Sequence, residues 1–561
     1  MLKHDSPISG IATHMDRYIA TAGYDNKVVL WDAISGKPLA RSWHDHLANQ
    51  VAFSSCGRFL VTSSSDYSAR VWSIPSLKLV KLLENHTDDV EGIAFHPTRD
   101  LIATSCRDSL VRVFDFFGGV VEFKGHTADS ISVTWEDDGD GLISSSDDGT
   151  IKRWSLKGRK LVEDIDLGGV ETDTVALTSK GEILAGNDDG EIILIKGGKK
   201  FFFRAHDAGI KKLAFEQKFN KLASLSYDRK VKIWDFDGEK LVECHSAELP
   251  PVVWPRSCAF LSEKEIVFGT FGSKYAKYNF LKRSWDLDSI EDTQGINNLT
   301  FYQNKVWTVG DAGVVRVDGN QICRIPSLLN FIVHLGDIPL TGGQTGEVFN
   351  AATGEKYYQF RSPLNCATGF KRGTKDYVVI GTYTGEGLVF CQSMEHGRIE
   401  LIATISLHAN AIKSISSSKG VLFSVAATSD AAFHSTDSFE ILKFVDNAHG
   451  KIANGCATAG DGIFVSVSRD LKLRIWSEQT ASIYDTPHHH SIKCVAVSED
   501  NLYVGSCDYR GNFACFSLAE KKFTTHAKIT DAGISSVIAF KEGFLAASYD
   551  GNVYPLEKHL C

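Results

Sequence analysis

The 561-residue sequence predicts an all-β fold built from repeated four-stranded units. Histidines recur at intervals near 40 residues, at His46, His86, His126 and His206 and again at His408, His449 and His490. Alternating apolar residues and turn signals run along the chain without a convincing amphipathic helix. A catalytic group is needed once per site, whereas a residue that recurs in every unit is a structural part. The period therefore predicts β-propeller blades.

A second recurring feature is an acidic residue followed six positions later by a large apolar one. The acidic series advances by 39 to 42 residues through Asp25, Asp66, Asp108, Asp148, Asp189 and Asp228. The apolar series is Trp31, Trp72, Phe114, Trp154, Ile195 and Trp234. Each unit is expected to hold an inner strand such as 92–95 and a second strand such as 101–106. A turn with the acidic residue, a third strand and a short outer strand follow.

The second half keeps this rhythm with weaker signals. Its turn residues are Ser273, Asp311, Thr345, Thr384, Asp430, Asp470, Asp508 and Asp550. Together the two halves hold fourteen units of about 40 residues. One closed ring of fourteen blades lies outside the usual range of about four to eight. The sequence therefore predicts two seven-bladed β-propellers, with fourteen four-stranded blades in total.

The boundary between the two propellers has two interpretations. In the preferred one, residues 1–247 form blades 1–6 of the first propeller, which the C-terminal blade 531–561 completes. Residues 248–530 then form blades 7–13, and the proline-dense segment 247–257 is the crossing linker. This interleaving would let the N-terminal segment complete the last blade. The alternative is a simple split into 1–290 and 291–561.

Segments such as "TAGYDNKVVLWD" (21–32), "SLSYDRKVKIWD" (224–235) and "SVSRDLKLRIWS" (466–477) resemble WD40 repeats. The resemblance implies a buried hydrogen-bonded network of His, Ser or Thr, Asp and Trp in each complete blade. The complete sets are His4, Thr21, Asp25, Trp31; His126, Ser144, Asp148, Trp154; His206, Ser224, Asp228, Trp234; and His449, Ser466, Asp470, Trp476. His46, Thr62, Asp66 and Trp72 make a fifth set. We interpret these residues as structural, because buried polar groups need hydrogen-bond partners.

The same resemblance implies that the face carrying the acidic turns binds peptides or partner proteins. The residue just before the turn acid is Tyr24, Arg107, Asp147, Tyr227, Arg469 or Tyr549. Tyr and Arg are enriched at protein–protein hot spots, so the partner-binding hypothesis rests on Tyr24, Tyr227, Tyr549, Arg107 and Arg469. In the interleaved arrangement, the three tyrosines form one contiguous patch. The alternative is that each tyrosine only packs over the adjacent turn.

Composition favours some function classes over others. A net charge of −9 leaves no basic footprint for nucleic acid. The twelve cysteines contain no C-x-x-C pair and indicate thiols in a reducing compartment. The N-terminus lacks the apolar core of a signal peptide, and no run reaches membrane-spanning length. We expect a cytoplasmic protein, with a nuclear location as the alternative, and we expect no membrane partner.

Chemical sites are expected to be absent. The run 488–490 holds three histidines, but adjacent side chains in an extended segment diverge, so a metal site is not favoured. We find no phosphate loop and no nucleophile with a separately placed base. The sequence therefore predicts no catalytic, cofactor-binding or metal-binding residue.

The leading functional hypothesis is a non-catalytic scaffold that uses two rigid propellers to hold partner proteins. The overall plan is similar to that of actin-interacting tandem-propeller proteins, so actin or an actin-binding protein is an expected partner. One alternative is a subunit of a ribonucleoprotein or ribosome-assembly complex. A further alternative is a propeller enzyme with a site in the central channel.

Overall fold

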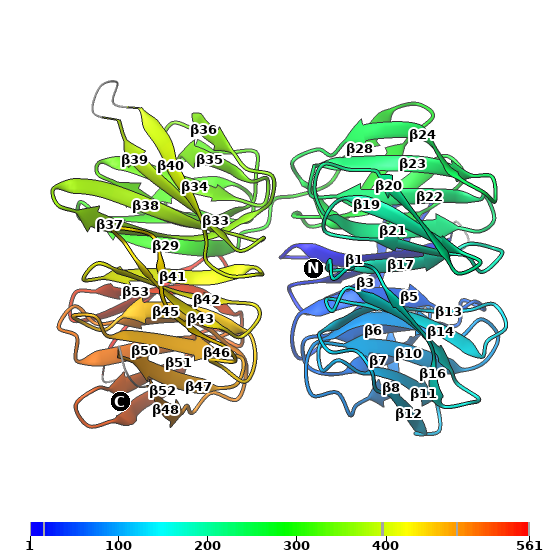
Figure 1. Ribbon diagram of the computed structural model, residues 1–561, viewed down its shortest axis with the longest axis horizontal. Helices are drawn as coiled ribbons and strands as arrows, with labels where there is room; N and C mark the ends of the chain where they lie inside the picture. Colours follow the sequence, from blue (N-terminus) through cyan, green and yellow to red (C-terminus); the bar gives the residue numbers. More distant parts are fainter. Residues whose placement is uncertain (1, 15–16, 394–397, 478–480, 559–561) are drawn as a thin grey trace. The chain divides into compact units, whose positions relative to one another are not determined.

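The computed structural model describes residues 2–14, 17–393, 398–477 and 481–558 (Figure 1). Over these residues the chain forms 55 β-strands and no helix. The strands make fourteen separate antiparallel sheets, thirteen with four strands and one with three. The predicted all-β fold with fourteen blades is confirmed. The three-stranded sheet is the last one, β53 (Ile534–Phe540), β54 (Gly543–Ser548) and β55 (Val553–Leu556).

Each four-stranded blade is a simple meander. Blade 4, for example, runs from the inner strand β13 (Ser130–Trp135) through β14 (Gly141–Ser146) and β15 (Thr150–Ser155) to the outer strand β16 (Lys160–Asp166). Its second strand is buried throughout, whereas most of its outer strand is exposed. The second strand is flanked by a strand on each side, whereas the outer strand forms the edge of the sheet and is paired on one side only.

The chain divides into unit 1, Met1–Thr293, and unit 2, Gln294–Cys561. The inner strands of unit 1 are β1 (Ile8–His14), β5 (Ala48–Phe53), β9 (Val90–Phe95), β13, β17 (Thr174–Leu177), β21 (Ile210–Glu216) and β25 (Val253–Phe260). Those of unit 2 are β29 (Ile296–Tyr302), β33 (Leu329–Leu335), β37 (Leu364–Arg372), β41 (Ile412–Ser418), β45 (Ala453–Thr458), β49 (Ile492–Val497) and β53. Within each unit, every inner strand packs against that of the next blade, and the last against the first. Each unit is thus a seven-bladed ring.

Ring closure in unit 1 occurs between blades 7 and 1, and this overturns the interleaved arrangement. Strand β1 packs against β25, and Thr13 Oγ1 donates a hydrogen bond of 2.6 Å to the Phe260 carbonyl oxygen. The segment that was expected to be a crossing linker, 247–257, instead leads into β25 and supplies its first five residues. The assignment of residues 1–247 with 531–561, and of 248–530, is therefore wrong.

Blade 14 closes unit 2. Ser535 Oγ donates to the Ile296 carbonyl oxygen at 2.5 Å, and the rings of Phe301 and Phe540 meet edge to face at 4.9 Å. The boundary falls after Thr293, three residues from the alternative split at 290. Every blade is made of consecutive strands, so neither ring borrows a segment from the other end of the chain.

A β-bulge recurs at the start of the inner strand. Pairing with the second strand shifts by one residue at this point in most blades, as at Val90/Gly92 and Ile210/Lys212. A bulge re-aims the extra side chain. Polar bulge residues hydrogen-bond to the inner strand of the next blade, as Asn330 Nδ2 does to the Leu364 carbonyl oxygen at 2.8 Å. Where the bulge residue is charged, as at Glu91 and Lys211, it joins the cluster described below.

Candidate functional site

The predicted His–Ser/Thr–Asp–Trp sets are buried hydrogen-bond relays. In blade 6, Trp234 Nε1 donates to Ser224 Oγ at 2.9 Å, and His206 Nε2 lies 2.8 Å from the same oxygen. His206 Nδ1 lies 2.9 Å from Asp228 Oδ2. Because a carboxylate can only accept, we assign the proton to Nδ1, so that Ser224 donates to Nε2. The relay therefore runs from indole to hydroxyl to imidazole to carboxylate.

The other complete sets have the same arrangement. They are His4, Thr21, Asp25, Trp31; His126, Ser144, Asp148, Trp154; and His449, Ser466, Asp470, Trp476. All four imidazole side chains are fully buried. Both ring nitrogens of each are engaged, which suits a structural role.

The periodic spacing selected the wrong histidine in two blades: His46 was assigned to the blade 2 relay, and His490 was counted in the histidine series. In blade 2, His44 and not His46 lies 2.6 Å from Thr62 Oγ1 and 3.0 Å from Asp66 Oδ2. In blade 13, His488 and not His490 lies 2.9 Å from Ser506 Oγ. Both errors have one cause: the spacing between relay histidines of successive blades varies, from 42 residues between His44 and His86 to 39 between His449 and His488, so a fixed interval selects the wrong histidine. In each case the relay histidine lies two residues earlier.

Blade 5 shows what replaces the relay. Leu167, Ala185 and Ile195 occupy the histidine, serine and tryptophan positions and share one buried apolar cluster. Substituting every polar partner by an apolar group leaves no unsatisfied donor. The network and the apolar set are thus two solutions to the same packing problem.

Two relay histidines lack a carboxylate partner, and we therefore expect the stability of the protein to fall at acidic pH. The Nδ1 atoms of His86 and His408 are buried without a hydrogen-bond partner in the described part of the chain, and burial lowers the pKa of each to about 4. The unfolded chain takes up these protons near pH 6.5, so stability falls as pH drops from about 6.5 to about 4. Each site contributes on the order of 3 kcal/mol. We expect the melting temperature to fall between pH 7 and 5, and His408→Gln to reduce this slope. An unchanged slope in the variant would contradict the assignment.

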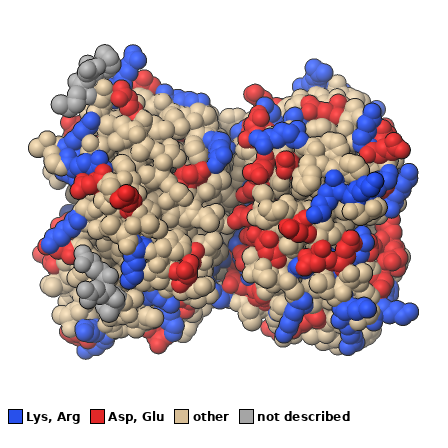
Figure 2. Space-filling view, viewed as in Figure 1, with Lys and Arg blue, Asp and Glu red and all other residues tan. Residues whose placement is uncertain are grey.

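The mouth of the unit 1 channel gathers charged residues from blades 3 to 7. We call this set the mouth cluster. Its carboxylates are Asp89, Glu91, Asp129, Asp147, Glu171, Asp173 and Asp188, and its cations are Arg107, Lys211 and Arg256. They come from the bulges, from the residues before the inner strands and from the turns after the second strands. Figure 2 shows many Asp and Glu side chains on the face of unit 1 that is turned to the viewer.

Ion pairs connect the mouth cluster across the channel. Arg107 donates to Glu91 Oε1 at 2.7 Å and to Asp129 Oδ2 at 2.6 Å. Arg256 of blade 7 reaches Glu91 of blade 3 at 3.4 Å, although blades 1 and 2 lie between them in the ring. Lys211 contacts both Asp173 and Asp188. The side chains therefore span the channel at this end.

Asp147 is the member of the mouth cluster whose ionised form is most strongly disfavoured. Burial raises the pKa of its carboxyl well above the usual value, and the nearby charges of Asp173, Glu171 and Asp129 raise it further. Arg107 acts in the opposite direction. Burial also raises the pKa of Asp129 and Asp188. Perturbed carboxyls concentrated in one channel mouth mark a functional-site candidate.

An aromatic arc borders the carboxylates. Tyr24 of blade 1 meets Trp254 of blade 7 edge to face at 5.1 Å, and Trp254 lies 5.5 Å from Phe271. Tyr227 of blade 6 lies under the Lys211 ammonium group at 5.1 Å. Trp254 and Phe271 occupy the place between blades 6 and 1 that the sequence interpretation assigned to Tyr549. The predicted three-tyrosine patch was therefore wrong about Tyr549, because blade 7 and not blade 14 lies between blades 6 and 1.

The remaining two hypothesised residues lie in unit 2. Tyr549 donates its backbone N–H to the Gly533 carbonyl oxygen at 3.0 Å, in the closing blade. Arg469 donates its backbone N–H to Ile452 at 3.1 Å in blade 12. Sequence reasoning missed Glu91, Asp173, Lys211, Trp254 and Arg256. The signal that could have found them is the start of each inner strand, where the bulge directs a side chain into the channel.

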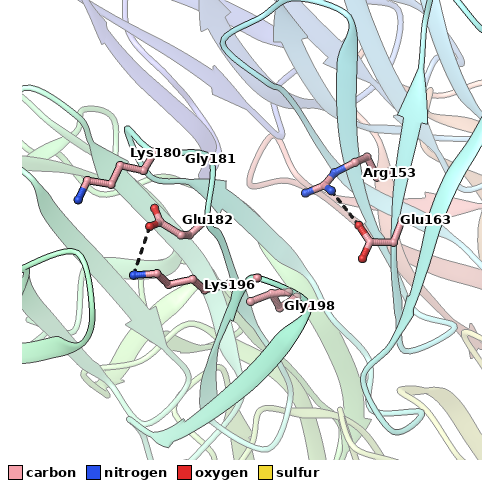
Figure 3. A pocket seen from close by; sticks show the side chains of 9 residues that line it. Arg153, Glu163, Lys180, Gly181, Glu182, Lys196 and Gly198 are labelled. Atoms are coloured by element: carbon pink, nitrogen blue, oxygen red, sulfur yellow. Dashed lines mark hydrogen bonds and ion pairs between the residues drawn. The ribbon is translucent and has the colours of Figure 1, made fainter.

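A separate cavity of about 290 Å³ lies at the rim between blades 4 and 5 (Figure 3). Arg153 and Glu163 form an ion pair of 2.8 Å on one side, and Lys196 and Glu182 lie 3.8 Å apart on the other. Glycines 197 and 198 form part of the lining. These charged groups are paired with one another, so the mouth cluster is the stronger candidate.

Metal-binding groups and membrane-spanning helices are both absent from the residues that the structure describes. No group of three or more His, Cys, Asp or Glu within those residues has a metal-binding arrangement. No helix capable of crossing a membrane occurs in the same part of the chain.

Comparison with known proteins places the repeats in unit 1. The profile of the WD domain, G-beta repeat, matches residues 1–32, 37–73, 77–115, 119–155 and 197–235. WD repeat-containing protein 37 of Mus musculus is 35% identical over 108 residues, which is 18% of this chain and 22% of that protein. The chain thus matches about a fifth of that relative's length.

Longer matches have lower identity. The target of rapamycin complex subunit wat1 of Schizosaccharomyces pombe is 26% identical over 231 residues, 38% of this chain and 73% of that protein. The transcriptional corepressor LEUNIG_HOMOLOG of Arabidopsis thaliana is 24% identical over 269 residues, 39% of this chain and 34% of that protein. Five repeat matches, all within residues 1–235, and the buried relays together show that unit 1 carries WD40 repeats, and the fourteen antiparallel sheets are consistent with two β-propellers.

Proposed function

We propose that the protein is a non-catalytic scaffold that binds partner proteins through the channel mouth of unit 1. The observation that supports this most is the mouth cluster with its aromatic arc, because Tyr, Trp and Arg are the residue types enriched at hot spots. Tyr24, Tyr227 and Arg107 are all partly exposed there. The relatives include subunits named for a complex, the target of rapamycin complex subunit wat1 and the transcription initiation factor TFIID subunit 5.

The distribution of histidines supports a binding role over catalysis. The imidazoles of the four complete relays are buried and hydrogen-bonded through both nitrogens. A general base must reach a substrate proton, and these groups are enclosed between blades. The mouth cluster instead offers carboxylates, guanidinium groups and aromatic rings, which suit recognition.

The test is partner capture by the full chain with and without the mouth aromatics. We expect the double variant Tyr24→Ala, Tyr227→Ala to lose its specific partners by at least tenfold, because about two hot-spot rings are removed. Phe117→Ala is the matched control, since Phe117 is 98% exposed on an outer turn of blade 3. Quantitative mass spectrometry of the captured proteins gives the readout. Equal capture by all three proteins would contradict a binding site at the mouth.

The identity of the captured proteins decides between the finer proposals. Actin or actin-binding proteins would support the cytoskeletal role suggested by the tandem plan, and direct cosedimentation with actin filaments would test it. RNA-processing subunits would favour the ribonucleoprotein alternative. Either set must depend on Tyr24 and Tyr227 to be attributed to the mouth.

A further inference from the structure

The mouth cluster carries an excess of negative charge that its own cations do not neutralise. Seven carboxylates face three cations, and each cation is already held by carboxylates. Arg107 holds Glu91 and Asp129, whereas Lys211 holds Asp173 and Asp188. Like charges brought together in a partly dehydrated site repel one another. The mouth is therefore complementary to a positively charged ligand.

Asp147 marks the place where such a ligand would act. Its Oδ1 atom is buried without a hydrogen-bond partner from the described part of the chain. The charges that act most strongly on it are those of Asp173, Glu171 and Asp129, all negative. A buried acceptor with no donor costs free energy that an incoming N–H group would recover. This is a second observation, independent of the charge count, that points to a ligand with hydrogen-bond donors.

Arg256 shows which kind of donor the mouth accepts. Its guanidinium lies over the Trp254 ring at 5.5 Å and approaches Glu91 Oε2 at 3.4 Å. The protein's own arginine thus stacks on the aromatic arc while it pairs with a mouth carboxylate. A guanidinium combines both interactions because it is planar, permanently charged and weakly hydrated. A ligand segment that carries an arginine would find both kinds of group at this mouth, the unpartnered Asp147 Oδ1 acceptor for its guanidinium and the Tyr24 and Trp254 rings for the residues beside it.

From this geometry we propose that the mouth of unit 1 binds an extended, arginine-containing peptide segment of a partner protein. One guanidinium enters between Asp147, Glu171 and Asp173 and donates to Asp147 Oδ1. The neighbouring part of the segment lies along Tyr24 and Trp254. This proposal rests on the proposed function, because it names the chemistry of the partner that the same mouth recognises.

The test is peptide binding by the full chain, measured by fluorescence anisotropy. The probe is a labelled nine-residue peptide with two arginines among glycine and alanine, and its counterparts replace arginine by citrulline or glutamate. We expect the arginine peptide to bind with an affinity that falls as salt rises, and the other two to bind at least tenfold more weakly. Asp147→Asn combined with Glu171→Gln should weaken the arginine peptide at least tenfold.

Matched controls separate the mouth from total charge. Asp137→Asn combined with Glu239→Gln removes the same two charges at exposed positions of unit 1 and should leave binding unchanged. Equal weakening by both double variants would overturn the proposal, as would equal binding of the citrulline peptide. Calorimetric titration with CaCl₂ tests the competing ligand, and stoichiometric Ca²⁺ binding lost in the mouth variant would also overturn it.

Failure of the arginine-peptide proposal can be distinguished from failure of the scaffold proposal. If partner capture still depends on Tyr24 and Tyr227 while the arginine peptide fails to bind, cationic recognition is refuted and the scaffold role stands. If both measurements fail, the mouth is not the partner site.

Discussion

Replacing Ser224 by Ala should lower the melting temperature of unit 1 by roughly 5–15 °C, corresponding to about 2–4 kcal/mol. Ser224 Oγ accepts from Trp234 Nε1 at 2.9 Å and lies 2.8 Å from His206 Nε2. The substitution removes the shared oxygen and leaves an indole donor and an imidazole acceptor buried without partners. Because the groups act as one relay, the loss is larger than that of a single hydrogen bond. Differential scanning calorimetry measures the shift.

Ser224→Thr is the matched control. Blades 1 and 2 use Thr21 and Thr62 at the same position, where the hydroxyl serves both neighbours. The threonine variant should therefore melt within a few degrees of the unmodified protein. A catalytic role for these residues would be indicated instead if Ser224→Ala abolished an activity while the melting temperature stayed the same.

Replacing Arg107 by Met should destabilise unit 1 by about 3 kcal/mol. Arg107 lies between Glu91 and Asp129 at 2.7 and 2.6 Å, and its side chain is only 23% exposed. Its removal leaves these carboxylates and Asp147 close together with one cation fewer. Breaking a buried ion pair at one partner is costly for this reason, even where the pair itself contributes little. The result would identify Arg107 primarily as the group that holds the mouth together.

Asp147→Asn should stabilise unit 1, in contrast to Arg107→Met, and the pH dependence of its melting temperature checks this expectation. The pKa of Asp147 is raised in the folded state, so the native protein loses stability as pH rises above the unfolded value near 4. Asparagine lacks this cost. The variant should therefore melt at a higher temperature at pH 7, and the difference should disappear below about pH 4. A lower melting temperature at pH 7 would contradict the electrostatic account.

A residue whose removal stabilises the fold is expected at a binding site. Asp147 is predicted to raise stability when neutralised and to weaken arginine-peptide binding at the same time. Functional sites often keep such unfavourable groups, because the ligand supplies the missing interaction. The two measurements on one variant thus test a single physical statement.

The candidate site was only partly predictable. Tyr24, Tyr227 and Arg107 were identified from the turn position, because that position repeats in every blade. Their partners were not, since Glu91 and Arg256 are 165 residues apart and meet only across a closed ring. No local pattern reports such a distance. The carboxylates before each inner strand resembled ordinary solvated residues until the ring brought them together.

The sequence by itself determined the all-β class, the fourteen blades and four of the buried relays. These features depend on short sequence patterns, and each pattern recurs in successive blades about 40 residues apart. Only the tertiary structure decided which blades are neighbours at the closures and which charges share a channel. The physical reason is that a periodic sequence pattern is the same for every order in which the blades could close a ring. Ring closure depends instead on packing between strands such as β1 and β25, which are far apart in the chain.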